Sequence, residues 1–501
     1  MTRQLLESYT LSADGVTGIV SIFQDSEENV GLYDLALPQL DIATKAVLQE
    51  ISEKLSRETP VNIEEITDPT KIRALKDAFY VQAAESLREK FTNMSEEKIK
   101  LLAGILLHNM YGLGEIEVFL ADDFLEEIAI NNSVYPITVF HKKHGWLKST
   151  RKLDDEESIY NFASQIGRKV GRQISALDPI MDAHLLTGDR VAATLFPVST
   201  LGNTITIRKF ARSPWTIISL IQNKTTSKEI VAFLWLAIQY ENSILVTGGT
   251  ASGKTSFLNA LSIFIPPKQR IISIEDTREI ELSEAQHWNW VPLSSRDKNP
   301  EGLGEVTMLD LMVASLRMRP DRIIVGEVRR KEQAETMFEA MHTGHSVYTT
   351  MHADTVEQIK RRLLEPPLSI PKAELEALQL IVVQHRDRRK NVRRTLEVAE
   401  ILQGGKELAL NYVFRWRPRV DKFELSNKSS RIFEELNLHV GMTLDQIEQD
   451  LREKEMILQW MIDQDMGNIV QVGKIMELYY RSPELVVCAA QAKKSFSHLF
   501  P

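Results

Sequence analysis

A glycine-rich run that ends in lysine and threonine is the clearest chemical signal in the chain. It has the pattern G-x-x-x-x-G-K-[ST], in which backbone N–H groups and a lysine bind a phosphate chain. The apolar residues 243–247 before it are typical of a buried strand, and residues 256–263 are typical of a helix. This context favours a phosphate-binding loop over a glycine-rich turn without a ligand. The residues of the run are Gly248, Gly249, Thr250, Ala251, Ser252, Gly253, Lys254 and Thr255.

The last two residues of this run have specific expected roles. We expect Lys254 to reach the β- and γ-phosphates of a nucleotide and Thr255 to bind Mg²⁺. A second cluster, IEDTRE at residues 274–279, places carboxylates at the end of another apolar strand. Carboxylates beside Mg²⁺ and a γ-phosphate can polarise an attacking water. A charged exit from a strand, with no catalytic role, is the alternative.

Two further clusters end apolar segments. In RMRPDRIIVGEVR, residues 317–329, Glu327 follows the strand and could orient magnesium or its water, although a solvated charge is possible there. In TGHSVYTTMH, residues 343–352, His345 and His352 flank a short strand. Their seven-residue separation is too long for the usual helical zinc spacing. A lone histidine is more often an ordinary core or surface residue, so the spacing alone leaves their role open.

Composition narrows the function classes. The 501 residues are 43% apolar and 26% charged, as in an ordinary globular protein, and are enough for several domains. The net charge of −9 argues against a general affinity for nucleic acid. The one cysteine, Cys488, excludes an intrachain disulfide and a cysteine-based zinc site, and its apolar surroundings predict a buried thiol.

The first half of the chain predicts two regions. Residues 1–36 alternate weakly, which indicates one or two strands or else a partly ordered segment, and three segments with helical spacing follow. We therefore expect residues 1–112 to be mainly helical, with a small bundle formed by residues 42–57, 69–90 and 96–110. Short strands and one helix predict an α+β domain at residues 113–212, and residues 213–225 are expected to be a linker.

Residues 226–501 predict an α/β domain. Apolar strands at 244–247, 270–274, 323–325 and 346–350 alternate with helices, which favours a mostly parallel, helix-covered sheet with ligands at the carboxyl ends of its strands. Helical patterns from about residue 436 predict a C-terminal helical subdomain. The basic run 385–394 is expected to be a solvated hairpin, or else a contact for an acidic partner or a membrane surface.

The order and spacing of the four clusters resemble the motifs of the type II/IV secretion ATPase superfamily. These are a Walker A loop, an acidic Asp box, a Walker B motif with glycine in place of the usual aspartate, and a His box. The match spans about residues 110–420. The resemblance implies that Glu279 is the catalytic glutamate. It implies that Glu327 is the Walker B glutamate, which also binds Mg²⁺. It implies that His345 and His352 sense the state of the nucleotide.

The same resemblance implies a fold and an assembly. It implies a RecA-like P-loop domain preceded by a PAS-like α+β domain, in homo-hexameric rings that use ATP and Mg²⁺. Arg190 and Arg208 lie where the family's arginine fingers are expected. The charge that develops on a transferred γ-phosphate requires cations beyond those of the phosphate loop, which supports this role. Ordinary surface arginines are the alternative.

Two details indicate which branch of the superfamily the chain resembles. The chain cannot form the four-cysteine zinc module common in bacterial members, and the runs YGLGEIE (111–117) and DDFLEEI (122–128) resemble archaeal members. The whole is most similar to the archaellum motor ATPases. That resemblance implies an ATPase that powers archaellum assembly and rotation.

Its expected partners are a polytopic membrane platform protein and other archaellum motor subunits, without nucleic acid. The N-terminus lacks the apolar core of a signal peptide, and the longest apolar run, residues 230–238, is too short to span a membrane. We therefore expect a cytoplasmic protein, peripheral at the inner face of the cell membrane, that meets the membrane only through partners. An archaeal type IV pilus-assembly or type II/IV secretion ATPase remains an alternative, and a non-catalytic nucleotide-binding scaffold a lesser one.

Overall fold

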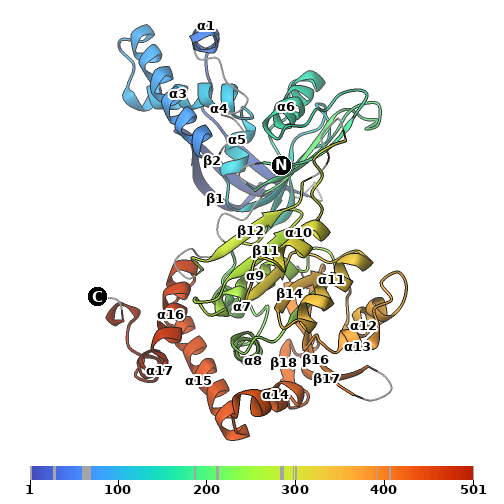
Figure 1. Ribbon diagram of the computed structural model, residues 1–501. Coiled ribbons are helices and arrows are strands. Elements are labelled where there is room, and N and C mark those ends of the chain that lie inside the picture. Colours follow the sequence, from blue (N-terminus) through green and yellow to red (C-terminus); the bar gives the residue numbers. More distant parts are fainter. Residues whose placement is uncertain are drawn as a thin grey trace. The chain divides into compact units, whose positions relative to one another are not determined.

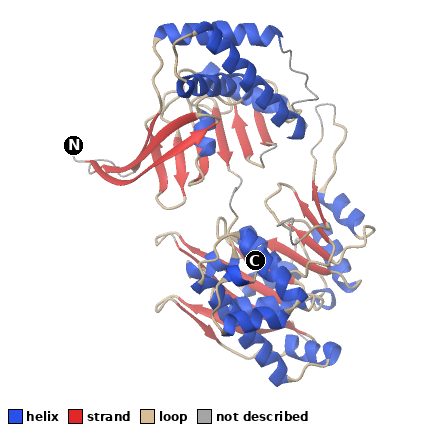
Figure 2. Cartoon of the chain, turned by 90° about the vertical axis from the view of Figure 1, so that its left-hand side faces the viewer, coloured by secondary structure: helices blue, strands red, loops and turns tan. Residues whose placement is uncertain are grey.

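The computed structural model describes residues 3–25, 30–58, 69–185, 188–209, 214–282, 287–296, 298, 302–390, 392–404 and 408–499. The described residues up to 209 form one compact unit, and those from 214 onward form a second. Each unit has its own sheet, drawn as red arrows in Figure 2, and its own helices (Figure 1). Within the described residues, no helix has both the length and the apolar character needed to cross a membrane.

The first unit is built on a nine-stranded sheet in the order β1-β2-β3-β6-β5-β4-β9-β8-β7. Its paired neighbours are antiparallel apart from β3 and β6, which run parallel. The strands are β1 (Arg3–Ala13), β2 (Val16–Asp25), β3 (Gly31–Ala36), β4 (Leu125–Ile130), β5 (Thr138–His141), β6 (Gly145–Ser149), β7 (Ile180–His184), β8 (Arg190–Thr194) and β9 (Thr204–Arg208).

The N-terminal strands are an integral part of this sheet. The sequence predicted one or two strands before residue 36, whereas the structure has three, and they continue the sheet that holds β4 to β9. A buried carboxylate fastens them there: Asp122 accepts hydrogen bonds from the hydroxyls of Tyr9 and Tyr33, each at 2.7 Å. The regions predicted on either side of residue 112 therefore share one sheet.

The helices of the first unit form two packed groups. The helices are α1 (Ile42–Glu58), α3 (Pro69–Lys90), α4 (Glu96–Tyr111), α5 (Ile116–Ala121) and α6 (Glu156–Lys169). Helices α1, α3 and α4 share a core that includes Leu48, Phe79 and Leu102, as the helical spacing predicted. Helices α5 and α6 pack on the sheet through residues such as Phe119 and Ile159. Sequence periodicity missed α5 and β7, which are short.

The second unit is built on a nine-stranded sheet in the order β12-β11-β13-β14-β10-β15-β16-β17-β18. From β12 to β15 neighbouring strands are parallel, and from β15 to β18 they are antiparallel. The strands are β10 (Ile244–Gly248), β11 (Ile271–Glu275), β12 (Trp290–Ser294), β13 (Arg322–Val325), β14 (Ser346–Met351), β15 (Leu380–Asp387), β16 (Val392–Leu402), β17 (Ala409–Arg417) and β18 (Lys422–Leu425).

Helices cover both faces of this sheet. Ile244 and Val246 of β10 point into a core shared with α7, α8, α9 and the C-terminal helices, while Leu245 points into a core shared with α10, α11 and α12. The alternation follows from the two-residue period of a strand buried on both faces. The helices are α7 (Ile217–Gln222), α8 (Lys228–Gln239), α9 (Lys254–Leu261), α10 (Met308–Ser315), α11 (Lys331–His342), α12 (Val356–Leu364), α13 (Lys372–Leu375), α14 (Arg431–Val440), α15 (Leu444–Asp463), α16 (Ile469–Arg481) and α17 (Pro483–Gln491).

Two expectations about this unit need correction. The segment 213–225, predicted to be a linker, contains α7, whose Ile217 and Ile218 are buried in the core of the second unit. Cys488, predicted to be buried, is exposed. It lies on α17, where Val486 and Ala489 face the core, so the apolar run around it forms a helix with only one buried side.

Candidate functional site

The phosphate-loop pattern lies between β10 and α9, as its sequence context predicted. The loop needs glycine at its start because a Cβ on Gly248 would come within 2.2 Å of the carbonyl oxygen of Gln384. It needs glycine again before the helix, where Gly253 caps α9 with a φ of 88°. The loop thus enters the N-terminus of a helix, where backbone N–H groups and the helix dipole favour an anion.

Lys254 folds back across its own loop. Its side chain is only 8% exposed, and Nζ donates hydrogen bonds to the carbonyl oxygen of Gly249 at 3.1 Å and to Nδ1 of His352 at 3.3 Å. An ammonium group has donors only, so Nδ1 of His352 must be the acceptor. His352 therefore carries its proton on Nε2, unless the ring becomes charged. Burial and then the charge of Lys254 lower the pKa of His352, which favours this neutral form.

A continuous polar chain runs on from His352. Its Nε2 lies 3.2 Å from Oε1 of Glu327, and Oε2 of Glu327 accepts from Arg329 at 2.8 Å. Arg329 also lies 3.3 Å from Oδ2 of Asp276. The backbone carbonyl of His352 is held by Arg362 at 2.6 Å. The chain therefore links the lysine of the phosphate loop to the carboxylates after β11.

Sheet topology explains why these residues meet. Strands β11, β13, β14 and β10 are parallel neighbours in that order, so their carboxyl ends share one edge. Asp276, Glu327 and His352 follow three of these strands, and the phosphate loop follows the fourth. The expectation that the sequence clusters lie at the carboxyl ends of parallel strands is confirmed for these residues.

Glu275 is buried and holds the backbone of the acidic segment, residues 274–281, which contains the IEDTRE cluster. It is 2% exposed, and its Oε1 accepts from the backbone N–H groups of Glu279 and Ile280 at 2.9 and 3.0 Å. Burial raises the pKa of Glu275 to about 7. A Cβ on Gly326 would come within 3.1 Å of Cγ of Glu275. Glycine at position 326 therefore makes room for this buried glutamate.

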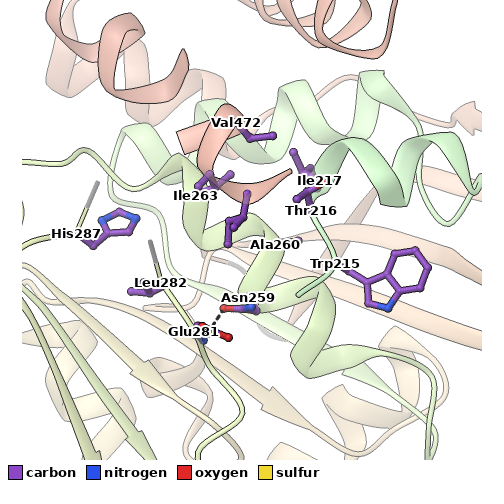
Figure 3. A pocket seen from close by; sticks show the side chains of 11 residues that line it. Trp215, Thr216, Ile217, Asn259, Ala260, Ile263, Glu281, Leu282, His287 and Val472 are labelled. Atoms are coloured by element: carbon purple, nitrogen blue, oxygen red, sulfur yellow. Dashed lines mark hydrogen bonds between the residues drawn. The ribbon is translucent and has the colours of Figure 1, made fainter. Parts of the chain in front are cut away.

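A small cavity lies between α9 and the end of the acidic segment (Figure 3). Its volume is about 10 Å³, which is room for about one water molecule. At its wall, Oδ1 of Asn259 on α9 accepts from the backbone N–H of Glu281 at 3.1 Å, the dashed line in Figure 3. Together with Glu275, this bond holds three successive backbone N–H groups, so the backbone at Glu279 is fixed from two sides.

The side chain of Glu279 itself is exposed. Among the described residues its carboxylate makes no hydrogen bond or ion pair, so the structure does not join it to Lys254 or Glu327. Thr255 is half-buried in the first turn of α9, next to Lys254. Both residues therefore lie in the segments that border the site, but outside the polar chain.

The loop fits a phosphate chain by an observation independent of its pattern. The hydroxyl oxygen of Ser252 is buried and has no hydrogen-bond partner within the described part of the chain. A buried polar atom without a partner is costly, and phosphate oxygens could accept from it. No cluster of three or more His, Cys, Asp or Glu side chains that could hold a metal occurs among the described residues. Magnesium in phosphate sites typically uses one or two protein ligands together with substrate phosphates.

His345 does not join the site. It precedes β14, whereas His352 follows it, so the six-residue strand separates them by about 20 Å. Nδ1 of His345 lies 3.1 Å from Oγ1 of Thr343 and 3.2 Å from the carbonyl oxygen of Ala340, at the end of α11. The two histidines that the sequence grouped together therefore occupy opposite edges of the sheet.

Arg190 and Arg208 lie in the first unit, directly opposite each other on β8 and β9. Both are exposed. Arg190 forms a two-point ion pair with Asp182, and Arg208 lies opposite Glu127 on its other side. Like charges in register repel, so these carboxylates offset the repulsion between the arginines. The structure thus brings the two exposed arginines together where β8 begins and β9 ends.

Sequence reasoning missed several residues of the site. Glu275 and Arg329 were within the recognised motifs but had no assigned role, although a carboxylate at the end of a buried strand is a usable signal for Glu275. Arg362 and Asn259 carry no signal in the sequence, because their contacts join segments far apart in the chain.

Comparison with known proteins places these motifs in a family context. Residues 181–405 match the family model described as "Type II/IV secretion system protein". An uncharacterized protein of Methanocaldococcus jannaschii is 33% identical over 458 residues, which are 87% of this chain and 82% of that protein. The type IV secretion system protein PtlH of Bordetella pertussis is 30% identical over 276 residues, which are 50% of this chain and 80% of PtlH.

A solved structure is also similar in part. The crystal structure of the VirB11 ATPase from the Brucella suis type IV secretion system shares 26% identity, and the match covers 56% of this chain and 91% of that chain. Its TM-score against this chain is 0.29.

Proposed function

Because the chain belongs to the type II/IV secretion system ATPase family, we propose that it is a Mg²⁺-dependent ATPase that drives a membrane-embedded filament or secretion machine. The observation that carries this proposal is the polar chain from Lys254 through His352 and Glu327 to Arg329 and Asp276. It joins the phosphate loop to the acidic segment through residues that follow the carboxyl ends of four different strands. A passive nucleotide-binding scaffold would not need this connection.

In this proposal each group has one task. The loop N–H groups, Ser252 and Lys254 hold the phosphates, and Thr255 and Glu327 hold Mg²⁺, which when bound neutralises charge on the phosphate oxygens. Glu279, whose backbone is fixed, polarises the attacking water. His352 reports whether Lys254 is engaged, because phosphate binding would take the lysine away from Nδ1.

The assembly is part of the proposal as well. In it the second unit is the RecA-like engine, the first unit is PAS-like, and six copies form a ring. Arg190 and Arg208 supply arginine fingers in this proposal, since both are exposed and lie opposite each other on neighbouring strands. Turnover then requires assembly, and domain motion driven by hydrolysis acts on a polytopic membrane platform protein.

The direct test is the rate of ATP turnover against protein concentration, with Mg²⁺ or with a chelator, and with the oligomer mass measured in the same samples. We expect turnover that needs Mg²⁺ and rises as a ring forms. Turnover by a monomer at a rate independent of concentration would contradict the assembly, and the absence of turnover in an assembled ring would contradict independent ATPase activity.

The specific machine that we favour is the archaellum, with the protein at the inner face of the cell membrane beside other motor subunits. The support is the resemblance of residues 111–117 and 122–128 to archaeal members of the family. An archaeal type IV pilus or secretion machine is the second candidate, favoured by the names of relatives such as PtlH. In the source organism, Glu279→Gln should abolish swimming. Loss of adhesion or secretion with normal swimming would favour the second candidate.

A further inference from the structure

The basic run of residues 385–394 borders the phosphate loop. Gln384 of β15 is in register with Gly248, the last residue of β10, and β15 continues three residues further, to Asp387. There it pairs with the start of β16, so the hairpin of β15 and β16 extends past the end of β10. The run that the sequence predicted to be a solvated hairpin is indeed a hairpin, but it is not only solvated.

Arg393 on β16 is hydrogen-bonded to the loop. Its Nε donates a hydrogen bond to the carbonyl oxygen of Ala251 at 3.1 Å. A Cβ added at Gly253 would lie 3.4 Å from Cδ of Arg393, so the aliphatic part of the arginine passes close to that glycine. Ala251 has a φ of 59°, a left-handed conformation that costs a residue with a side chain about 1–2 kcal/mol. The arginine therefore holds the loop where its backbone is least favourable.

The neighbouring arginine has a different and purely internal role. Arg394 is buried, and its Nε and one terminal nitrogen donate to both carboxylate oxygens of Asp421 at 2.7 and 2.8 Å. In contrast, Arg393 is only half-buried and uses only Nε, so its two terminal nitrogens have no partner among the described residues. A planar guanidinium with two unused donor groups matches phosphate oxygens well.

Local charge points to the same class of ligand. Arg393 lies directly opposite Arg386 in the hairpin, and like charges in register repel. Lys254 adds another positive charge on the loop that Arg393 contacts. The positive charges of Arg393 and Lys254 at the loop therefore favour an anion at its rim.

We propose that Arg393 is a nucleotide-binding residue of this site, acting within its own chain. Through Nε it holds the phosphate loop in its binding shape at Ala251, and its terminal nitrogens bind an oxygen of the phosphate chain of a nucleoside di- or triphosphate. This inference rests on the proposed function, since it assigns Arg393 to the same nucleotide. It gives the hairpin a role that its charge alone did not reveal.

The test is the affinity of the full-length protein for ADP, measured by calorimetry, for Arg393→Ala, Arg393→Lys and two controls. Arg389→Ala removes a charge from the same hairpin at a residue whose backbone N–H, rather than its side chain, bonds to Asp387. Arg394→Ala removes the internal ion pair. The melting temperature without nucleotide is recorded for each variant, so that loss of folding is separated from loss of binding.

We expect Arg393→Ala to weaken ADP binding at least about tenfold, the effect of losing a hydrogen bond to a charged group. Arg393→Lys should recover part of that loss because it keeps the charge. Arg389→Ala should bind ADP like the wild type, and Arg394→Ala should melt earlier but bind normally while folded. Wild-type affinity in Arg393→Ala, or an equal loss in both controls, would overturn the inference. No ADP binding by the wild type would overturn the proposed function as well.

Discussion

Nζ of Lys254 lies 3.3 Å from Nδ1 of His352, although 98 positions separate the two residues in the sequence. The contact fixes the histidine proton on Nε2, which faces Glu327 at 3.2 Å. Capture of Lys254 by a phosphate would remove the donor from Nδ1 and leave that nitrogen free to bind a proton. In the function proposed above, the histidine would convert occupancy of the loop into a change at Glu327.

The first prediction separates the two histidines of the His box. His352→Ala should lower kcat by about 5- to 150-fold, the range of a typical coupling energy, and leave ADP affinity near that of the wild type. His345→Ala is the matched control, because His345 lies at the other edge of the sheet and should leave kcat unchanged. Equal losses in both variants would contradict a special role for His352.

The second prediction concerns the pH dependence of stability. The pKa of Glu275 is about 7 in the folded protein and has an ordinary value of 4.5, so the folded state binds more protons than the unfolded state between these values. The free energy of unfolding should therefore fall as pH rises from about 4.5 to about 7 and then level off. The fall attributable to Glu275 is about 3 kcal/mol.

Urea unfolding at pH 5 and pH 8 tests this prediction. Glu275→Gln should remove this part of the pH dependence while keeping an oxygen that accepts from Glu279 and Ile280. Glu279→Gln, at an exposed position of the same segment, should retain most of the wild-type pH dependence, because burial is the main cause of the raised pKa of Glu275 and the charge of Glu279 is a smaller one. An unchanged pH dependence in Glu275→Gln would show that another group is responsible.

The third prediction tests how the N-terminal strands are held. Asp122→Ala should lower the free energy of unfolding of the first unit by about 3 kcal/mol, because it leaves the buried hydroxyl of Tyr33 and the half-buried hydroxyl of Tyr9 without their acceptor. Asp123→Ala, at the exposed neighbouring position, should have little effect. Equilibrium unfolding in urea measures both. Equal stability of the two variants would contradict the anchoring role of Asp122.

The fourth prediction addresses the arginine pair. Arg208→Ala should lower kcat by about 10³-fold with little change in ADP affinity, as expected of a cation that acts on the transition state. Arg190→Ala should do the same if the two act together. Arg168→Ala, at the exposed end of α6, is the control. Full turnover in Arg208→Ala would rule out a catalytic role for that residue.

Much of the second unit could be predicted from local signals. Buried parallel strands have continuous apolar runs, so β10, β11, β13 and β14 were placed within one or two residues. The phosphate loop and the clusters after these strands followed from known patterns. The expectation that these clusters meet followed from one rule, that ligands in parallel sheets bind at the carboxyl ends of the strands.

The remainder depended on contacts between distant segments. Nothing local shows that β1 to β3 join β4 to β9, because strand pairing is set by packing across more than a hundred residues. The role proposed for Arg393 could not be predicted, because its charge alone does not distinguish a solvated arginine from one that is hydrogen-bonded to the phosphate loop. His345 was assigned to the site because it shares a motif with His352. The length of the strand between the two histidines already implied that they lie at opposite ends of that strand.

In the function proposed above, this site hydrolyses ATP with Glu279 as the group that activates water. The most direct measurement compares ATP affinity and ATP turnover for the wild type and Glu279→Gln in the same assembled samples. We expect Glu279→Gln to bind ATP with unchanged affinity and to turn it over at least about 100-fold more slowly. Wild-type turnover in Glu279→Gln would contradict this role of Glu279.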